Sequence, residues 1–188
     1  EWLAARIRGR SQVLEGQTIL ILGFGAIGRR LSEMLRPFRV KLLAVRRTVR
    51  GDEPVPTFPM TEMDRLLAEA NHVVSILPGG DSTNQIIDAR RLALMKPSAV
   101  FHNVGRGTTV DQSALRAALG AGQLAAAYLD VMNPEPLPPD DPLWTTPNCF
   151  ITPHTAGGSD DEFERVVRHF LANLGRFVRA DKLQDRVY

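Results

Sequence analysis

The sequence contains one cysteine in 188 residues, which excludes an internal disulfide and a cysteine-rich metal site. It has no run of 18 apolar residues, so no membrane-spanning segment is predicted. It also lacks a charge excess of either sign: 23 Lys and Arg against 21 Asp and Glu leave a net charge of +2. Neither nucleic acid nor an acidic membrane is therefore an expected partner. Because no His-Glu-x-x-His motif occurs, we expect no metal.

The chain also lacks an initiating Met, and residues 1–6 do not read as a secretory signal. We therefore expect a cytoplasmic protein that has been trimmed, or a domain cut from a longer chain. Hydrophobic residues make up 44% and charged residues 23%, which are ordinary values for a folded globular domain. The length fits one domain with at most a small appendage.

Short apolar runs alternate with amphipathic stretches along the whole chain. The runs predict strands over 18–22, 40–45, 72–76, 99–102, 125–129 and 149–151. The stretches between them predict helices over 26–36, 61–70, 84–95, 111–119 and 159–179. Strands separated by helices indicate parallel βαβ units, so the predicted fold class is α/β, a doubly wound, Rossmann-type parallel sheet.

Several residues mark the expected ends of these elements. Pro37 should end the first helix, Thr61 should cap the second, and Asp111 should cap the fourth, which Gly120 and Gly122 stop. Two long loops are expected. They cover residues 46–59 and the proline-rich residues 133–147.

A glycine-rich loop joins the first predicted strand to the first helix. Gly23, Gly25 and Gly28 match the pattern G-x-G-x-x-G in the strand–turn–helix context that a dinucleotide site requires. Gly23 permits the tight turn, Gly25 leaves room for a pyrophosphate, and Gly28 lets the helix pack closely on the strand. The free amides of Ala26 and Ile27 would then face the phosphates. A turn whose glycines serve only packing is the alternative.

The end of the second strand bears on which dinucleotide binds. An NAD site usually carries an acid about 20 residues beyond the loop, but this strand ends in Arg46, Arg47 and Thr48, and the nearest acid is Asp52. Two guanidiniums and a hydroxyl suit a 2′-phosphate, so NADP(H) is favoured and NAD(H) stays possible. In the alternative reading, both arginines are solvated loop cations.

Three polar residues each follow the carboxyl end of a predicted strand. They are Arg106, Glu135 and His154, and in an open parallel sheet that edge binds ligands. An imidazole can give or take a proton near neutral pH, and a neighbouring carboxylate favours its charged form. An arginine can hold the carboxylate of a 2-oxo acid. We expect these three groups to meet beside the cofactor, although each alone could be an ordinary loop residue.

The ordered motifs resemble the nucleotide-binding domain of the D-isomer-specific 2-hydroxyacid dehydrogenases. The resemblance runs from about residue 14 to residue 177. It rests on segments 23–28, 77–83, 103–107, 130–144 and 147–154. It implies that Arg106 binds substrate, that Glu135 tunes His154, and that His154 is the acid/base. It also implies that Asp130 contacts the nicotinamide carboxamide.

The resemblance implies further cofactor contacts on the same loops. They are Leu77, Pro78, Thr83, Val104, Gly105, His154 and Gly157. The arginine-bearing second strand looks most like the glyoxylate/hydroxypyruvate reductase branch, which uses NADPH. A dinucleotide-sensing scaffold, as in corepressor-like relatives, is the alternative function.

The resemblance also implies a domain organisation and partners. Residues 1–13 would be a linking helix from an absent substrate domain, 14–158 the dinucleotide-binding domain, and 159–188 a C-terminal helix and tail that packs toward the absent domain. The expected partners are a small 2-oxo or 2-hydroxy acid and a second copy, in a homodimer formed through the nucleotide-binding domain. The remaining histidines, His72, His102 and His169, and the lone Cys149 are read as structural.

Overall fold

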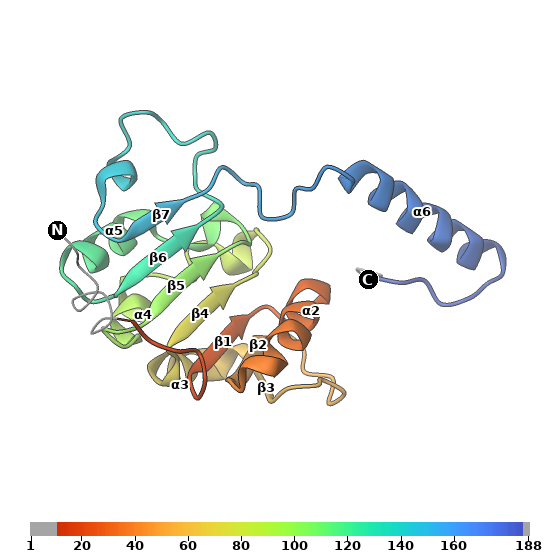
Figure 1. Cartoon of the computed structure of the whole chain (residues 1–188), viewed down its shortest axis with the longest axis horizontal. Helices are drawn as coiled ribbons and strands as arrows, with labels where there is room; N and C mark the ends of the chain where they lie inside the picture. The colour runs from red at the N-terminus through yellow and green to blue at the C-terminus, as the bar shows by residue number, and fades with distance from the viewer. Residues whose placement is uncertain (1–10, 186–188) are drawn as a thin grey trace. The chain divides into compact units, whose positions relative to one another are not determined.

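The fold is built on a seven-stranded parallel sheet (Figure 1). The computed structural model describes residues 11–185. The strands are β1 (Thr18–Leu22), β2 (Lys41–Arg46), β3 (Thr57–Pro59), β4 (His72–Ser75), β5 (Val100–Asn103), β6 (Ala126–Leu129) and β7 (Cys149–Ile151). Their order is β3-β2-β1-β4-β5-β6-β7, and every neighbouring pair is parallel. The order reverses between β1 and β4, which confirms the predicted doubly wound architecture.

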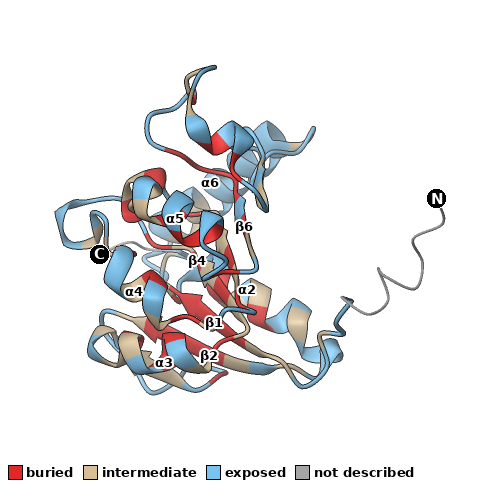
Figure 2. Cartoon of the chain, turned by 90° about the vertical axis from the view of Figure 1, so that its left-hand side faces the viewer, coloured by how far each residue is buried: buried red, intermediate tan, exposed pale blue. Residues whose placement is uncertain are grey.

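Helices cover both faces of this sheet. Helices α3 (Met63–Glu69), α4 (Ala89–Leu94) and α5 (Gln112–Gly120) lie on one face, and α2 (Ala26–Leu35) lies on the other (Figure 2). Successive side chains of a strand point to opposite faces. Leu20 and Leu22 accordingly join the larger core beneath α3–α5, whereas Ile21 joins a smaller core with Phe24 and Leu31. The continuous apolar run of β1 thus reflects a strand buried on both faces.

The observed elements differ from the expected ones at several points. The predicted helix 84–95 is wrong in its first half: α4 begins only at Ala89, because the side chain of Asp88 caps it by accepting a hydrogen bond from the Arg91 amide. Residues 84–88 instead approach the segment after β5, where Ile87 forms a bridge with Val110. The predicted loop 46–59 contains a short edge strand, β3, which pairs with β2.

Three predicted helix boundaries also shift. α2 ends at Leu35, one residue earlier than expected, and Pro37, which cannot donate the next helical hydrogen bond, lies in the 3-10 turn Arg36–Phe38 that follows. Thr61 caps nothing, because it lies within a 3-10 turn and α3 starts at Met63. The last helix, α6 (Glu162–Val178), is shorter at both ends than expected. By contrast, Asp111 caps α5 as predicted, by accepting from the Ala114 amide.

The chain divides into two units, one ending at Pro153 and the other beginning at His154. The second unit consists of α6 and the segments beside it. This helix has no buried residue, and its apolar side chains are exposed, with Phe163 at 88%. Of the predicted linking helix, residues 1–10 lie outside the described residues, and 11–13 form no regular element.

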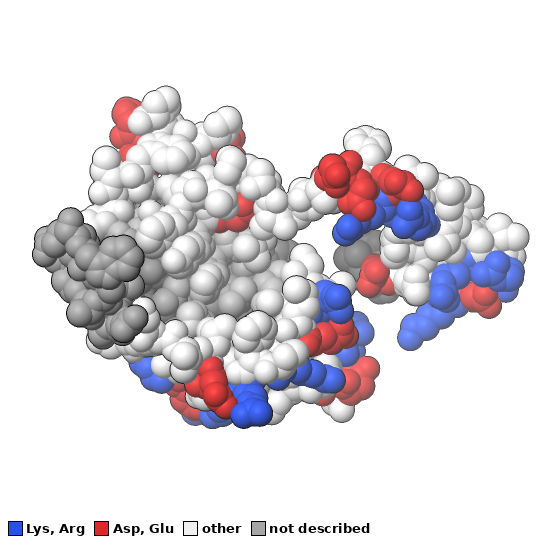
Figure 3. Space-filling view, viewed as in Figure 1, with Lys and Arg blue, Asp and Glu red and all other residues white. Residues whose placement is uncertain are grey.

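The β4–β7 part of the α2-side face carries a row of stacked rings. His102 on β5 lies between His72 and Tyr128, with ring centroids 5.5 and 5.3 Å away, and Phe150 follows at 4.7 Å from Tyr128. His72 Nδ1 and His102 Nε2 are 3.2 Å apart, so these two histidines, which the sequence reads as structural, are partners across neighbouring strands. In Figure 3 the charged side chains of this unit gather mainly toward α2 and the β2–β3 end, and much of the remaining visible surface is uncharged.

His102, the partly buried histidine in the middle of this row, should make the domain sensitive to mild acid. Burial, reinforced by His72, lowers the pKa of His102 to about 4. Between pH 7 and pH 5 the unfolded chain, with an ordinary histidine pKa near 6.5, takes up a proton that the folded chain refuses. His102 should therefore lower the free energy of unfolding by about 2 kcal/mol over that interval.

Urea unfolding at pH 7 and pH 5 measures this loss. His102→Phe keeps a ring for stacking and should abolish most of this acid-dependent fall in the free energy of unfolding. The control variant His169→Phe alters an exposed histidine of α6 and should retain it. An unchanged loss in His102→Phe would contradict the prediction.

Candidate functional site

The glycine loop between β1 and α2 has the geometry of a dinucleotide-binding turn. Gly23 has φ +93°, a conformation that side-chain-bearing residues rarely adopt, and its amide donates to the Val45 carbonyl at 2.9 Å. A Cβ on Gly28 would lie 2.9 Å from the Gly23 carbonyl oxygen, so this glycine allows α2 to pack against the turn. A Cβ on Gly25 would meet no described atom within 4 Å, which leaves space above the loop.

The first turn of α2 is open to a ligand. Gly25 is its N-cap and offers no side chain to the amides that follow, and Ala26 and Ile27 are both exposed. The first amides of a helix have no partner within the helix, and they carry its partial positive charge. With the open space at Gly25, these amides form a cradle that fits a pyrophosphate.

The end of β2 carries the predicted 2′-phosphate residues, in different surroundings. Arg46 is only 16% exposed and forms a salt bridge through Nη1 with Glu53 Oε1 at 2.9 Å. Arg47 and Thr48 are exposed. No hydrogen bond or ion pair involves either side chain within residues 11–185. The two arginines that the sequence treats alike therefore differ: one is paired and nearly buried, and the other is free at the surface.

The segment after β4 borders the same edge. Leu77 is 5% exposed and Pro78 is exposed, and the Thr83 hydroxyl donates to the Pro78 carbonyl at 2.7 Å. Val104, after β5, donates its amide to the Ser75 carbonyl of β4 at 3.1 Å. The Val104 bond joins the segment after β5 to β4, the Thr83 bond closes the loop after β4, and Ile76 lies against Gly23 of the glycine loop.

Arg106 lies between two glycines that bring its loop against both neighbours. A Cβ on Gly105 would lie 2.5 Å from the Leu77 carbonyl oxygen, and a Cβ on Gly107 would overlap the main chain of Met132. Asn103, 1% exposed, reinforces the loop by accepting from the Gly105 amide and donating to the Arg106 carbonyl. These contacts fix the loop that carries Arg106. Arg106 itself is exposed.

The loop after β6 brings two carboxylates to this edge. Asp130 is 5% exposed, and its Oδ1 accepts from the Thr152 hydroxyl at 2.6 Å. Glu135 is exposed, and its Oε1 accepts from the Met132 amide at 2.8 Å. Because Met132 also lies against Gly107, the loops that carry Glu135 and Arg106 are in contact. The structure therefore places both loops at one edge of the sheet.

His154 and Gly157 belong to the second unit. His154 is exposed and has φ +52°, and Gly157 is exposed with open space around its Cα. Thr152, two residues before His154, directly follows β7, and its amide donates to the Leu129 carbonyl at the end of β6 at 2.9 Å. The role of His154 beside Arg106 and Glu135 stays a prediction.

Three residues at this edge have roles that sequence reasoning did not find. Glu53 neutralises Arg46, Thr152 binds Asp130, and Asn103 braces the Arg106 loop. Glu53 lies seven positions from Arg46 and meets it only because the chain turns back at Gly51, which has φ +85°. The other two contacts join or brace loops whose geometry the sequence leaves open.

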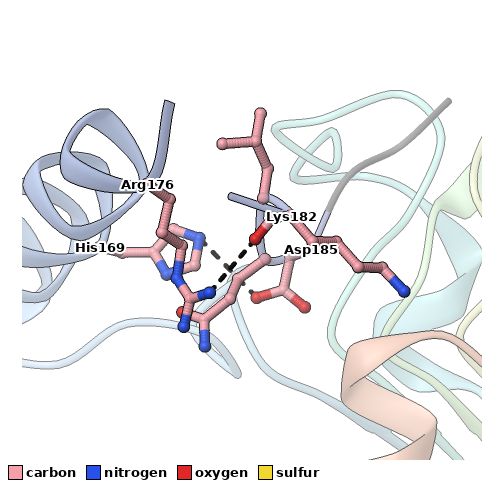
Figure 4. A pocket seen from close by; sticks show the side chains of 6 residues that line it. His169, Arg176, Lys182 and Asp185 are labelled. Atoms are coloured by element: carbon pink, nitrogen blue, oxygen red, sulfur yellow. Dashed lines mark hydrogen bonds and ion pairs between the residues drawn. The ribbon is translucent and has the colours of Figure 1, made fainter. Parts of the chain in front are cut away.

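A hollow in the second unit is separate from all these residues. It lies between α6 and the tail, and is lined by His169, Arg176, Lys182, Leu183, Gln184 and Asp185 (Figure 4). Its polar groups bind one another: Arg176 Nη1 donates to the Lys182 carbonyl at 3.2 Å, and His169 lies 3.7 Å from Asp185. None of the predicted site residues lines it.

Residues 11–185 offer neither a metal-binding cluster nor a membrane-spanning helix. Within residues 11–185 no cluster of three His, Cys, Asp or Glu side chains could hold a metal ion. None of the helices described is both long enough and apolar enough to cross a membrane. Cys149 is partly buried, and burial raises the pKa of its thiol to about 11, which is unsuited to a nucleophile.

Comparison with known proteins finds one family whose model matches most of the chain. The family model described as "D-isomer specific 2-hydroxyacid dehydrogenase, NAD binding domain" matches residues 1–156. A Corynebacterium melassecola protein described as an "uncharacterized protein in proB 3'region" is 47% identical over 179 residues, covering 95% of this chain and 59% of that protein. Glyoxylate/hydroxypyruvate reductase B of Shigella boydii is 38% identical over 173 residues, covering 91% and 52%.

A solved structure shows the same fold. The probable 2-hydroxyacid dehydrogenase from Rhizobium etli, in complex with NADP, HEPES and L(+)-tartaric acid, superposes with a TM-score of 0.84 at 30% identity. The match covers 98% of this chain and 61% of that one. The chain thus spans a little over half the length of the relatives it matches.

Gly107→Ala tests how much the close contact between the Arg106 loop and Met132 contributes to stability. The added methyl group has no room against Met132, so the loops must separate, and the free energy of unfolding should fall by about 2 kcal/mol. Gly120→Ala is the matched control, since a Cβ there meets nothing within 4 Å and alanine favours helices. Urea unfolding of both variants makes the comparison. Equal stability of the two variants would show that the contact is unimportant.

Proposed function

Because the chain belongs to the D-isomer specific 2-hydroxyacid dehydrogenases, as their NAD-binding domain, we propose that it binds NADP(H) for hydride transfer to a small 2-oxo acid. Glyoxylate and hydroxypyruvate are the proposed substrates of the whole protein. The observation that carries this proposal is the meeting, at one sheet edge, of the open glycine loop and the glycine-flanked Arg106. Homodimerisation and a cytoplasmic location stay predictions of the family resemblance.

The cofactor half of the proposed site is the edge formed by β1, β2 and β4. The uncapped amides at Ala26 and Ile27 would hold the pyrophosphate, and the space at Gly25 would admit it. The exposed Arg47 and Thr48 would bind the 2′-phosphate. When bound, the cofactor supplies the hydride.

The substrate half is the edge formed by β5, β6 and β7. Arg106, whose loop is braced by Gly105, Gly107 and Asn103, holds the carboxylate of the 2-oxo acid. His154 gives a proton to the C2 oxygen as it gains negative charge, and Glu135 favours the charged imidazole that can do so. Asp130, which accepts a hydrogen bond from Thr152, would orient the nicotinamide carboxamide.

The two arginines at the end of β2 allow a direct test of cofactor choice. Arg47→Ala should weaken NADPH binding about tenfold or more and leave NADH binding within a factor of about two, because only NADPH carries the 2′-phosphate. Arg116→Ala, at an exposed site on α5 across the sheet, is the control and should change neither. Fluorescence titration of each variant gives both dissociation constants. Equal affinity of the unaltered chain for the two cofactors would refute the NADP preference.

The 188-residue chain should bind NADPH yet reduce glyoxylate only slowly, since it spans little more than half of its relatives' length. A cleft with one wall neither positions the substrate nor excludes water. His154→Asn should remove the remaining turnover and lower NADPH affinity by less than about threefold, because only one of several expected cofactor contacts changes. NADPH oxidation measures the turnover and fluorescence titration measures the affinity. Rapid turnover by the unaltered chain, or full activity of the variant, would contradict this mechanism.

A further inference from the structure

The carboxylate of Glu53 is nearly buried in the turn that follows β2. Its side chain is 3% exposed, in a loop whose flanking residues are exposed. Oε1 accepts from Arg46 Nη1 at 2.9 Å and from the Arg50 amide at 2.9 Å, and Oε2 accepts from the Gly51 amide at 2.8 Å. Three donors thus converge on one carboxylate and close the turn formed by residues 47–51.

The same contacts fix what the turn presents outward. Arg46 is held inward by Glu53, so its charge is already neutralised. Arg47, Thr48 and Arg50 are exposed, and no hydrogen bond or ion pair involves their side chains within the described part of the chain. The turn therefore offers two guanidiniums and a hydroxyl on its outer side, while its inner side is occupied by the Arg46–Glu53 pair.

The turn is also tied to the helix that begins at the glycine loop. Asp52 Oδ1 lies 3.4 Å from Arg29 Nη2 on α2, and the Arg29 guanidinium lies 5.7 Å from the ring centre of Phe24, inside the glycine loop. Val55, just beyond the turn, is buried in the same small core as Phe24. The buried packing of Val55 against Phe24 holds the turn beside the glycine loop, whereas the Asp52–Arg29 pair is exposed to solvent and contributes little.

We propose that Glu53 is a positioning residue for recognition of the 2′-phosphate of NADP(H). By holding Arg46 and the amides of Arg50 and Gly51, it shapes the turn so that Arg47, Thr48 and Arg50, rather than Arg46, donate to the phosphate. This inference rests on the proposed NADP(H) preference. It attributes the discrimination of NADPH from NADH partly to an acid that does not touch the cofactor.

The opposite role for Glu53 is that of the acid in an NAD site, which binds the ribose 2′-hydroxyl. Its geometry argues against that role. Both of its oxygens accept hydrogen bonds from the chain, and its side chain is almost fully covered. The amide donors lower the pKa of Glu53 to about 2, so the carboxylate stays ionised and keeps these donors throughout the physiological pH range.

The test compares Glu53→Ala, Glu53→Gln and Arg46→Ala in the full chain, by fluorescence titration with NADPH and with NADH. Glu53→Ala should weaken NADPH binding about tenfold and NADH binding by less than about threefold. Arg46→Ala should have a similar effect, and the double variant should be no worse than either single variant, because the two side chains act as one unit. Glu53→Gln, which keeps the size of the side chain but not its charge, should show a smaller loss of the same kind.

Asp52→Ala is the matched control, because it removes an exposed carboxylate from the same turn. Its effect on NADPH binding should stay below about threefold. Amide hydrogen exchange adds a readout that needs no cofactor: the Arg50 and Gly51 amides should lose protection in Glu53→Ala and keep it in Asp52→Ala. A change in the ratio of NADPH to NADH affinity distinguishes positioning from a general loss of stability, because lost stability would weaken the binding of both cofactors alike.

Each other outcome overturns the inference in a recognisable way. If Arg46→Ala weakens NADPH binding far more than Glu53→Ala, Arg46 is itself the phosphate ligand. If Glu53→Ala weakens NADH binding and strengthens NADPH binding, Glu53 is the acid that binds the ribose 2′-hydroxyl. If the unaltered chain prefers NADPH and both Glu53 variants keep that preference, only this inference fails. If the unaltered chain binds both cofactors equally, the proposed cofactor preference fails, and the inference fails with it.

Discussion

The candidate site depends on main-chain contact between loops at the carboxyl edge of a parallel sheet. Parallel strands bring their carboxyl ends to one edge, but the loops there can touch only where side chains are absent. Gly107 lies against Met132 and Gly105 against Leu77, so three loops that follow β4, β5 and β6 form a single surface. Gly28 does the same for α2 and the turn at Gly23. The polar groups of the site are thereby carried on a rigid frame.

Much of this frame was predictable from the sequence, because local patterns determine it. The apolar run of β1 and the glycines after it identify a buried strand followed by a dinucleotide-binding turn, and Asp111 marks the start of α5 correctly. The failures occur where distant contacts decide. Residues 84–88 are predicted as the start of a helix but approach the segment after β5, and the three residues of β3 form a strand only because β2 pairs with them.

The charged residues show the same limit more sharply. The sequence presents Arg46 and Arg47 as equivalent, and only the folded turn, through Glu53, pairs and partly buries Arg46 while Arg47 stays exposed. It likewise presents His72 and His102 as isolated residues thirty positions apart, whereas neighbouring strands bring their rings together. Residue type predicted the chemistry available at the edge, but the partner of each charge depends on turns and register that the pattern does not specify.

The central claim is that a nicotinamide dinucleotide lies along this edge, with its phosphates on the glycine loop and its adenosine end at the turn after β2. A crystal structure of the chain with NADPH tests this most directly. The pyrophosphate oxygens should lie within hydrogen-bond distance of the Ala26 and Ile27 amides, and the 2′-phosphate should lie beside Arg47 and Thr48. A cofactor bound elsewhere, or a 2′-phosphate turned away from that turn into solvent, would contradict it.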